Sequence, residues 1–226
     1  LGNYMTLFEF RAGLPTFFLN SVIISGLTVA ITLVVSSLGG YAVARFDFPF
    51  KNVLFLVTLA ILMVPYATLL IPLFVLLNDI GLGNTLLGLS LVLAMYQLPF
   101  AMFMMRISFE AVPRELEESA LCDGAGSFAV FRRIMLPLVL PGLITVALFA
   151  FLAAWNDFFA PLILISDPDQ SPLPLAIAVL RQQTMGVIDY GATEAGVVVM
   201  ALPVVILFLV LQRYYVRGFM SGAVKG

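Results

Sequence analysis

The residues best placed to interact with a partner lie in one polar stretch, 106–133. It carries nine of the chain's 24 charged residues (11 Lys and Arg plus 13 Asp and Glu), although the whole sequence is 62% hydrophobic. Pro113 suits the start of a short helix, and Glu115, Glu117 and Glu118 follow in its early turns, where carboxylates complement the helix dipole. Gly124 can adopt the left-handed backbone conformation that ends such a helix. We therefore predict a helix that offers carboxylates to a partner.

A second helix is predicted to follow over 128–136, capped by Ser127.

The composition excludes several other kinds of functional site. The chain has no histidine and one cysteine, Cys122, which excludes His-dependent zinc sites, Ser–His or Cys–His catalysis and an intramolecular disulfide. Its two lysines, Lys51 and Lys225, follow no glycine-rich phosphate loop, so this chain holds no P-loop of its own.

Seven residues in and just after the polar stretch match a known spacing: Glu118, Ser119, Ala120, Gly124, Ile134, Leu136 and Pro137. This spacing resembles the cytoplasmic loop signature of binding-protein-dependent ABC importer permeases. In that family the short helix docks into a cleft on the ATPase subunit and transmits its motion. Ser119 departs from the signature, since it stands where the family usually has alanine, but serine is nearly as small.

The resemblance implies six docking residues: Glu117, Glu118, Ser119, Ala120, Asp123 and Gly124. The glutamates are expected to offer charge to the ATPase, Ala120 to permit close packing, and Gly124 to set the turn. The alternative is an amphipathic helix that merely lies on the membrane surface. Its acidic polar face argues against this alternative, because such helices favour Lys and Arg there.

The rest of the chain is too apolar for a soluble globular domain, with a mean hydropathy of +1.10 and 11% charged residues. About 20 apolar residues cross a bilayer as a helix. We therefore predict an all-α polytopic membrane protein, one transmembrane domain over 1–226, with five membrane-spanning helices. The predicted spans are 17–44, 53–78, 86–105, 138–165 and 195–212. A cytoplasmic loop, 106–137, and an external loop, 166–194, join them.

Prolines and polar residues within the spans give further candidates. Pro65 and Pro72 predict a kink or local unwinding of the second span, either a bend that shapes packing or a broken segment that lines the pathway. Gln97 in the third span needs a hydrogen-bond partner, usually on a neighbouring helix. Gln97, Asn156 and Asp157 are candidates for the substrate pathway. For Asn156 and Asp157 the alternative is structural pairing.

Positive charge predicts the orientation of the chain. If the loop 106–137 is cytoplasmic, nine Lys and Arg residues lie inside and two, Arg11 and Arg181, lie outside. The inside set is Arg45, Lys51, Arg106, Arg114, Arg132, Arg133, Arg213, Arg217 and Lys225. The C-terminus is then cytoplasmic and the docking signature faces the ATPase. Trp155, about 25 Å along the helix from Leu138, is expected at the opposite interface as an ordinary anchor.

Further matches lie at Asn20-Ser21, 44–49, 82–85, 155–158 and 221–226. With them, nearly the whole chain is similar to sugar-importing permeases of the maltose type. Those permeases have a preceding helix that this sequence lacks. Five spans and a cytoplasmic C-terminus also place the N-terminus outside. We therefore expect the gene to encode a first span ahead of Leu1.

The resemblance implies the permease subunit of an ATP-driven, binding-protein-dependent importer of sugars or oligosaccharides, in a bacterial or archaeal cytoplasmic membrane. It implies a transport subunit and not an enzyme, with no cofactor in this chain and with ATP and Mg on a partner. The implied partners are a second permease subunit, two ATP-binding subunits, an extracytoplasmic solute-binding protein and the lipid bilayer. No basic run predicts nucleic acid.

Two alternatives stay open. The same architecture carries non-sugar solutes such as polyamine or glycerol phosphate. A secondary transporter needs no ATPase, but it would need ion-coupling carboxylates in mid-span, and the sequence has none there.

The external loop, 166–194, is longer than a helix–helix connection requires. Pro168, Pro172 and Pro174 stiffen its first part, and 175–183 has no helix breaker, which predicts a short helix there. One interpretation is that the loop packs on the neighbouring permease. The other is that 175–191 contacts the solute-binding protein.

Overall fold

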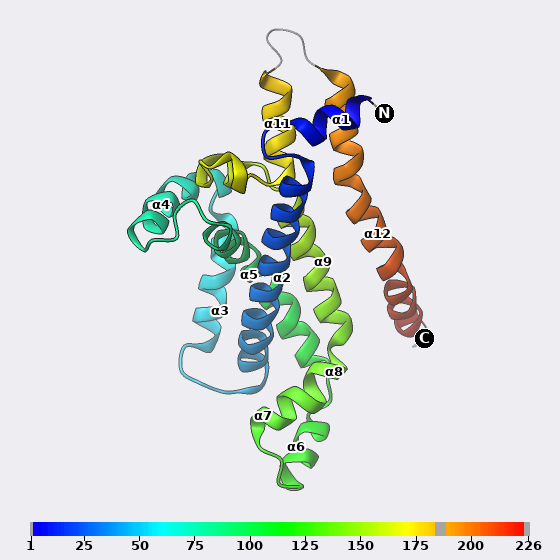
Figure 1. Ribbon diagram of the computed structural model, residues 1–226. Coiled ribbons are helices and arrows are strands. Elements are labelled where there is room, and N and C mark those ends of the chain that lie inside the picture. The colour runs from blue at the N-terminus through cyan, green and yellow to red at the C-terminus, as the bar shows by residue number, and fades with distance from the viewer. Residues whose placement is uncertain (1, 184–188, 224–226) are drawn as a thin grey trace. The chain divides into compact units, whose positions relative to one another are not determined.

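The computed structural model describes residues 2–183 and 189–223, with the backbone alone for 182–183 and 211–223. Residues 184–188 of the predicted external loop, and Lys225, therefore lie outside the described residues. All regular structure in the described chain is helical, which confirms the predicted fold class (Figure 1). The helices are α1 Gly2–Glu9, α2 Leu14–Arg45, α3 Lys51–Ala60, η1 Ile61–Met63, α4 Tyr66–Asp79, α5 Leu86–Glu110, α6 Arg114–Cys122, α7 Ser127–Val130, η2 Phe131–Met135, α8 Leu136–Leu138, α9 Leu140–Asn156, α10 Phe159–Leu164, η3 Pro168–Gln170, α11 Leu173–Gln183 and α12 Tyr190–Ala223.

Three helices are long and apolar enough to cross a membrane by themselves: α2, α5 and residues Tyr190–Val210 of α12. Two further stretches pass the same test only as bent pairs, Lys51–Met63 with Tyr66–Asp79 and Ser127–Leu138 with Leu140–Asn156. The described chain therefore reaches the predicted five spans when each bent pair counts as one span.

The bent pairs have local causes. Val64 is extended (φ −81°, ψ 125°), because the residue before a proline, here Pro65, is forced out of the helical region. The second predicted span is thus broken at Pro65, whereas Pro72 lies inside α4. In the fourth span, Val139 leaves helical geometry (φ −94°, ψ 12°) just before Pro141, and the chain bends there by 76°.

Helix ends also differ from prediction. α5 continues past 105 to Glu110, so the polar loop begins later than expected. Ser127 does not cap the second helix of that loop, because Gly126 occupies the cap position and no side chain bonds there. The stretch predicted as a helix over 128–136 instead contains a π-helical turn, Phe131–Met135, between two short α-helical pieces.

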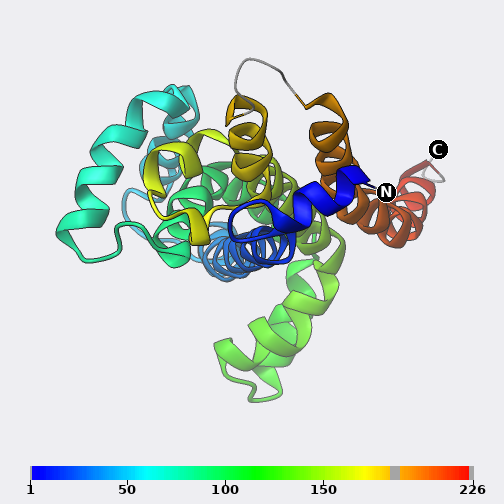
Figure 2. The same cartoon turned by 45° about the horizontal axis from the view of Figure 1, so that its top comes forward.

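The chain divides into two compact units. Unit 1 comprises Leu1–Thr28, Ala67–Leu93 and Phe151–Gly226; unit 2 comprises Val29–Tyr66 and Ala94–Ala150. In unit 1, α1 and α11 both pack against α12, as Figure 2 shows from a second direction. The unit 1 core draws apolar residues from these three helices and from the start of α2 and the end of α9: Leu7, Leu14, Phe17, Trp155, Leu173, Ala176, Ile177, Leu180, Ala192 and Ala195.

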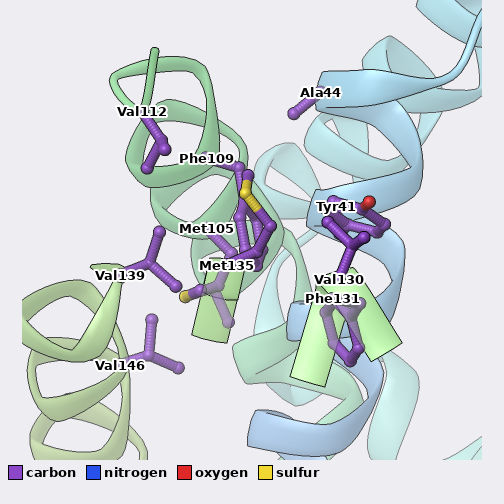
Figure 3. Close-up of a cluster of buried hydrophobic side chains, with 11 residues drawn as sticks. Tyr41, Ala44, Met105, Phe109, Val112, Val130, Phe131, Met135, Val139 and Val146 are labelled. Atoms are coloured by element: carbon purple, nitrogen blue, oxygen red, sulfur yellow. The ribbon is translucent and has the colours of Figure 1, made fainter. Parts of the chain in front are cut away.

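The unit 2 core gathers where α2, α5 and the helices of the polar loop meet (Figure 3). Its buried residues are Tyr41, Ala44, Ala101, Met105, Phe109, Val112, Val130, Phe131, Met135, Val139 and Val146. Two of these core residues, Phe131 and Met135, belong to the π-helical turn. Buried apolar residues after α6 therefore attach the polar loop to unit 2.

Candidate functional site

The candidate docking helix, α6, is set by the residues that flank it. Pro113 directly precedes the helix with an extended ψ of 134°, one position earlier than predicted. At the other end Gly124 has a φ of +85°. Its N–H donates to the Leu121 carbonyl and the N–H of Ala125 donates to the Ala120 carbonyl, both at 3.0 Å. This pair of bonds is a Schellman motif, so the predicted left-handed glycine is confirmed.

The outward face of α6 is polar and open. None of its residues is buried, and the exposed docking candidates are Glu118, Ser119, Asp123 and Gly124. Within the described part of the chain, no side chain pairs with the carboxylates of Glu115, Glu118 or Asp123. Leu116 and Leu121 lie among them, 46% and 44% exposed. The face therefore combines carboxylates that have no partner among the described residues with accessible apolar area.

The inward face of α6 carries the other two candidates. Ala120 is half-buried and packs against the unit 2 core. Glu117 also points inward, with a side chain only 14% exposed. Its Oε1 accepts a hydrogen bond of 2.5 Å from the Tyr41 hydroxyl, and its Oε2 lies 3.3 Å from Arg45 Nε. The Glu117 carboxylate is therefore engaged within unit 2, while the contact predicted for it with a partner stays a prediction.

Arg45 is the centre of this arrangement, at the last residue of α2. Its side chain is 4% exposed. One terminal guanidinium nitrogen donates to the carbonyls of Phe109, at 2.8 Å, and Val112, at 2.6 Å. These carbonyls lie at and just beyond the end of α5, where helix geometry leaves acceptors without partners. The Nε group faces Glu117 as an ion pair without the alignment of a hydrogen bond.

The arrangement therefore joins the ends of α2 and α5 to α6. Because both charges are largely out of water, removing one of them would leave the other unpaired, at a cost of about 3–5 kcal/mol. We call Tyr41, Arg45 and Glu117 the Arg45 cluster.

The ring of Tyr41 lies in the unit 2 core (Figure 3). Its centroid lies 5.0 Å from that of Phe131, 5.3 Å from that of Phe109 and 5.6 Å from that of Phe46. Centroids at such distances are in contact. The hydroxyl that holds Glu117 thus belongs to a ring fixed by aromatic residues of three different segments.

Sequence reasoning did not identify Tyr41 or Arg45 as site residues. Arg45 entered only the orientation of the chain and the family match at 44–49. The available signal was weak: an arginine in the last turn of a long apolar helix, four residues after a tyrosine. Their common partner, Glu117, lies more than seventy residues away in the sequence, and no spacing rule connects it to α2.

The substrate-pathway candidates have separate surroundings. Gln97, in unit 2, is half-buried, and its expected hydrogen bond is not found among the described residues. Asn156, in unit 1, is exposed and donates to its own helix at the Leu152 carbonyl, 2.8 Å away. Asp157 accepts a hydrogen bond of 2.9 Å from the Ala160 N–H at the start of α10. Their contact with a solute stays a prediction.

A cavity of about 570 Å³ lies beside Asn156 in unit 1. Its polar lining consists of Asn156, Arg181 and Thr193, and Phe158 offers an aromatic face. The remaining lining residues are Pro174, Ile177, Ala178, Val197 and Met200. An apolar cavity with a few convergent polar groups has the general make-up of a small-molecule site.

Trp155 is not the exposed interfacial anchor that the sequence suggested. It is 1% exposed. Its ring stacks on Phe151 at 5.5 Å and meets Phe18 edge-on at 5.6 Å. Its Nε1–H donates to the Met200 carbonyl at 2.9 Å, one turn before Pro203 in α12. Trp155 therefore holds α9 to α12 within unit 1.

The predicted external loop is a packed element rather than an open one. The helix expected over 175–183 is α11, which begins two residues earlier at Leu173. Asn84 Oδ1 accepts hydrogen bonds from the N–H groups of Ser166 and Asp167, at 2.8 and 3.0 Å. In the described residues this segment therefore packs on the chain itself, and its contact with a neighbouring permease or with the solute-binding protein stays a prediction.

Two residues at the start of α2 hold the same segment. Asn20 Nδ2 donates to the carbonyls of Asp169 and Ser171, at 2.8 and 3.1 Å. The hydroxyl of Ser21 accepts the N–H of Leu173, at 2.8 Å. Backbone groups at the start of α11 and in the segment before it thus find partners on α2.

Comparison with known proteins gives one matching family. Residues 36–220 match the family described as binding-protein-dependent transport system inner membrane component. The arabinooligosaccharides transport system permease protein AraQ of Halalkalibacterium halodurans is 39% identical over 227 residues, which cover 100% of this chain and 80% of that protein. The diacetylchitobiose uptake system permease protein NgcG of Streptomyces coelicolor is 38% identical over 202 residues, 89% of this chain and 67% of that protein.

A solved structure has the same fold. It is the crystal structure of a bacterial ABC transporter involved in the import of the acidic polysaccharide alginate. It superposes with a TM-score of 0.80 over 94% of this chain and 79% of that chain, at 22% sequence identity. The fold of the described residues is thus that of an importer permease.

Proposed function

This chain belongs to the family of binding-protein-dependent transport system inner membrane components, integral membrane subunits of ABC importers, and we propose that its solute is a sugar or an oligosaccharide. It is a transport subunit. Support for a sugar comes from relatives that cover most of the chain and whose names state arabinooligosaccharides and diacetylchitobiose. A trehalose transport system permease, SugB of Mycobacterium tuberculosis, is 37% identical over 92% of the chain.

We propose further that α6 docks on an ATP-binding subunit, which holds the ATP and Mg. One observation carries this proposal: the outward face of α6 has free carboxylates and accessible leucines, while Glu117 and Ala120 hold its inward face to unit 2. Closure of two ATPase subunits on ATP would then shift the equilibrium between inward-open and outward-open spans. The expected assembly has a second permease subunit and an extracytoplasmic solute-binding protein.

Reversal of one exposed charge tests the docking. Glu118→Lys should weaken binding of the ATPase subunits to the permease in nanodiscs by about tenfold, because it places like charge against the partner surface. Glu9→Lys, the same change at an exposed site of α1 in unit 1, is the matched control and should have no effect. Equal affinities for the two variants would contradict docking through α6.

The orientation is tested by the sole cysteine, Cys122, which is exposed on α6. A membrane-impermeant maleimide should label it in inverted vesicles and leave it unlabelled in right-side-out vesicles. Labelling in right-side-out vesicles alone would reverse the proposed orientation.

The solute is tested on the co-encoded solute-binding protein. A thermal-shift panel of mono- and oligosaccharides, polyamines and glycerol phosphate should identify a saccharide, and the reconstituted importer should take up the same compound. Stabilisation by a polyamine or by glycerol phosphate alone would overturn the sugar assignment and leave the importer assignment intact.

Contact between the solute-binding protein and 175–191 needs a refined test, because α11 is largely built into unit 1. Shortening 175–186 would remove buried core residues. Arg181 is exposed, so Arg181→Glu changes the surface without changing the core. Loss of ATPase stimulation by the loaded binding protein, with basal ATPase activity retained, would support the contact; unchanged stimulation would leave α11 a packing element.

A further inference from the structure

We propose that Arg45, acting through Glu117 and Tyr41, is the positioning residue that makes α6 move together with the ends of α2 and α5. The proposal rests on the docking of α6 proposed above and adds the connection by which motion of α6 reaches the spans. It assigns a role in coupling to two residues, Tyr41 and Arg45, that lie outside the docking face.

The first argument is the scarcity of other connections. α6 has nine residues and buries none of them, so apolar burial alone holds it weakly. In the described chain, Glu117 is the only residue of α6 whose side chain makes a hydrogen bond or an ion pair. The polar attachment of α6 to its unit therefore passes through the Arg45 cluster.

The second argument is the geometry of that attachment. Arg45 presents one nitrogen to two carbonyls, those of Phe109 and Val112, and another to Glu117. Guanidinium nitrogens keep a rigid planar arrangement, unlike the single flexible ammonium of lysine. A displacement of Glu117 therefore displaces Arg45, and with it the carbonyls at the end of α5.

The third argument is the stiffness of the receiving helices. A Cβ added at Gly40 of α2 would lie 2.6 Å from Met105 Cβ and 3.1 Å from the backbone nitrogen of Arg106. The two helices thus touch at backbone distance one turn before Arg45 in α2. Packing this close has little compressibility, so the ends of α2 and α5 respond as one body.

The test compares the buried pair with an exposed pair in the same unit. Arg106 Nε and Glu110 Oε1 form an ion pair at 2.8 Å with side chains 24% and 46% exposed. The variants are Arg45→Gln, Glu117→Gln and, as the matched control, Glu110→Gln. Tyr41→Phe is added because it removes only a hydroxyl and keeps the aromatic packing.

Three quantities are measured on the reconstituted complex: affinity for the ATPase subunits, solute taken up per ATP hydrolysed, and mobility of a spin label on Cys122 of the permease alone. Arg45→Gln should leave the ATPase affinity within about threefold. Arg45→Gln and Glu117→Gln should both lower uptake per ATP by about tenfold, the size of a typical coupling between sites. The spin label should become more mobile. Tyr41→Phe should show a smaller loss of the same kind, and Glu110→Gln none.

A merely structural role would reduce the amount of assembled complex and leave uptake per ATP, counted per assembled complex, unchanged. Arg45→Lys supplies a rescue test, since it keeps the charge and loses the fork; its uptake per ATP should lie between those of wild type and Arg45→Gln. If Arg45→Gln fails to assemble, Tyr41→Phe decides the question by the same ratio. Unchanged uptake per ATP in the assembled variants would overturn the proposal.

The docking proposal fails by a different result. If Glu118→Lys leaves ATPase binding unchanged, α6 is not the docking helix, whatever the Arg45 variants do. If Glu118→Lys weakens binding while the Arg45 and Glu117 variants couple normally, docking stands and the role of the Arg45 cluster is wrong.

Discussion

The two long polar gaps of the sequence, α6 with its turn and the segment 166–183, fold in opposite ways. α6 leaves the carboxylates of Glu115 and Glu118 unpaired among the described residues and has no buried residue. In the segment 166–183, backbone groups form hydrogen bonds with the side chains of Asn20, Ser21 and Asn84. Leu173, at the start of α11, is 1% exposed. Both gaps are polar in sequence. They differ because the chain forms hydrogen bonds to the polar groups of 166–183 but leaves most of those on α6 without a partner among the described residues.

The difference indicates where a partner is needed. A buried N–H or carbonyl must be paired, and unit 1 pairs those of 166–173 by itself. The unpaired carboxylates of α6 are exposed to water, so leaving them without a protein partner costs little free energy. We therefore expect a reversible contact with another protein at α6 and a permanently packed structural element at α11.

The sharpest test of this comparison is one leucine from each region. Leu173→Ala should lower the free energy of unfolding by about 2–5 kcal/mol, because it opens a cavity in a packed core. Leu116→Ala, at a site that is 46% exposed, should change it by no more than about 0.5 kcal/mol. Denaturation in mixed micelles, followed by far-UV circular dichroism, measures both. Similar losses for the two variants would remove the distinction between the regions.

The hydrogen bonds of the 166–173 segment are tested at Asn84. Asn84→Gly removes the acceptor of two N–H groups while suiting the left-handed φ of 52°. It should cost about 1–3 kcal/mol, because two hydrogen bonds of about 0.5–1.5 kcal/mol each are lost. Asn84→Asp keeps an oxygen in place and tolerates the same φ, so it should lose much less. The same denaturation measurement distinguishes them, and equal losses would show that the side-chain oxygen is not what holds the segment.

The sequence predicted the features that depend on local composition and on the backbone preferences of single residues. The helical fold came from apolar length, the break at Pro65 from proline geometry, and the left-handed Gly124 from its place after α6. The outward docking candidates followed from the family spacing, and their contact with an ATPase stays a prediction.

What escaped prediction depends on contacts between distant segments. Arg45 and Glu117 meet only after folding, and Trp155 could be placed at an interface by its position in a span but not against Met200. The packing of α11 was also out of reach, because hydrogen bonds from α2 and from Asn84 decide it. The π-helical turn at Phe131–Met135 has no sequence rule that would have marked it.

On the α6 side, Gly124 tests the turn that presents the docking face. A Cβ there would meet nothing within 4 Å, so space does not require glycine, whereas the φ of +85° does. Gly124→Val should strain the turn by about 1–3 kcal/mol and lower uptake per ATP. Gly124→Asn should retain most of it, because asparagine tolerates the left-handed region. Equal uptake per ATP in both variants would mean that the conformation of this turn does not matter for coupling.

The smallest expected effect comes from a third polar stretch, the turn after Arg45, where Lys51 pairs with Asp47. Lys51 Nζ lies 3.0 Å from Asp47 Oδ1, and the Asp47 side chain is 92% exposed. The hydrogen bond and charge of Lys51 lower the pKa of the Asp47 carboxyl below its ordinary value. A carboxyl with a lowered folded-state pKa stabilises the fold above its unfolded pKa, and the contribution is lost as the pH falls through the folded-state pKa.

Exposed pairs contribute little because water and salt screen them. Lys51→Gln should therefore raise the pKa of Asp47 toward its ordinary value, seen by carbon NMR titration of the labelled carboxyl, while the unfolding midpoint at pH 7 stays the same. A clear drop of that midpoint would show that an exposed, self-paired turn stabilises unit 2, and the contrast between buried and open polar groups would then need revision.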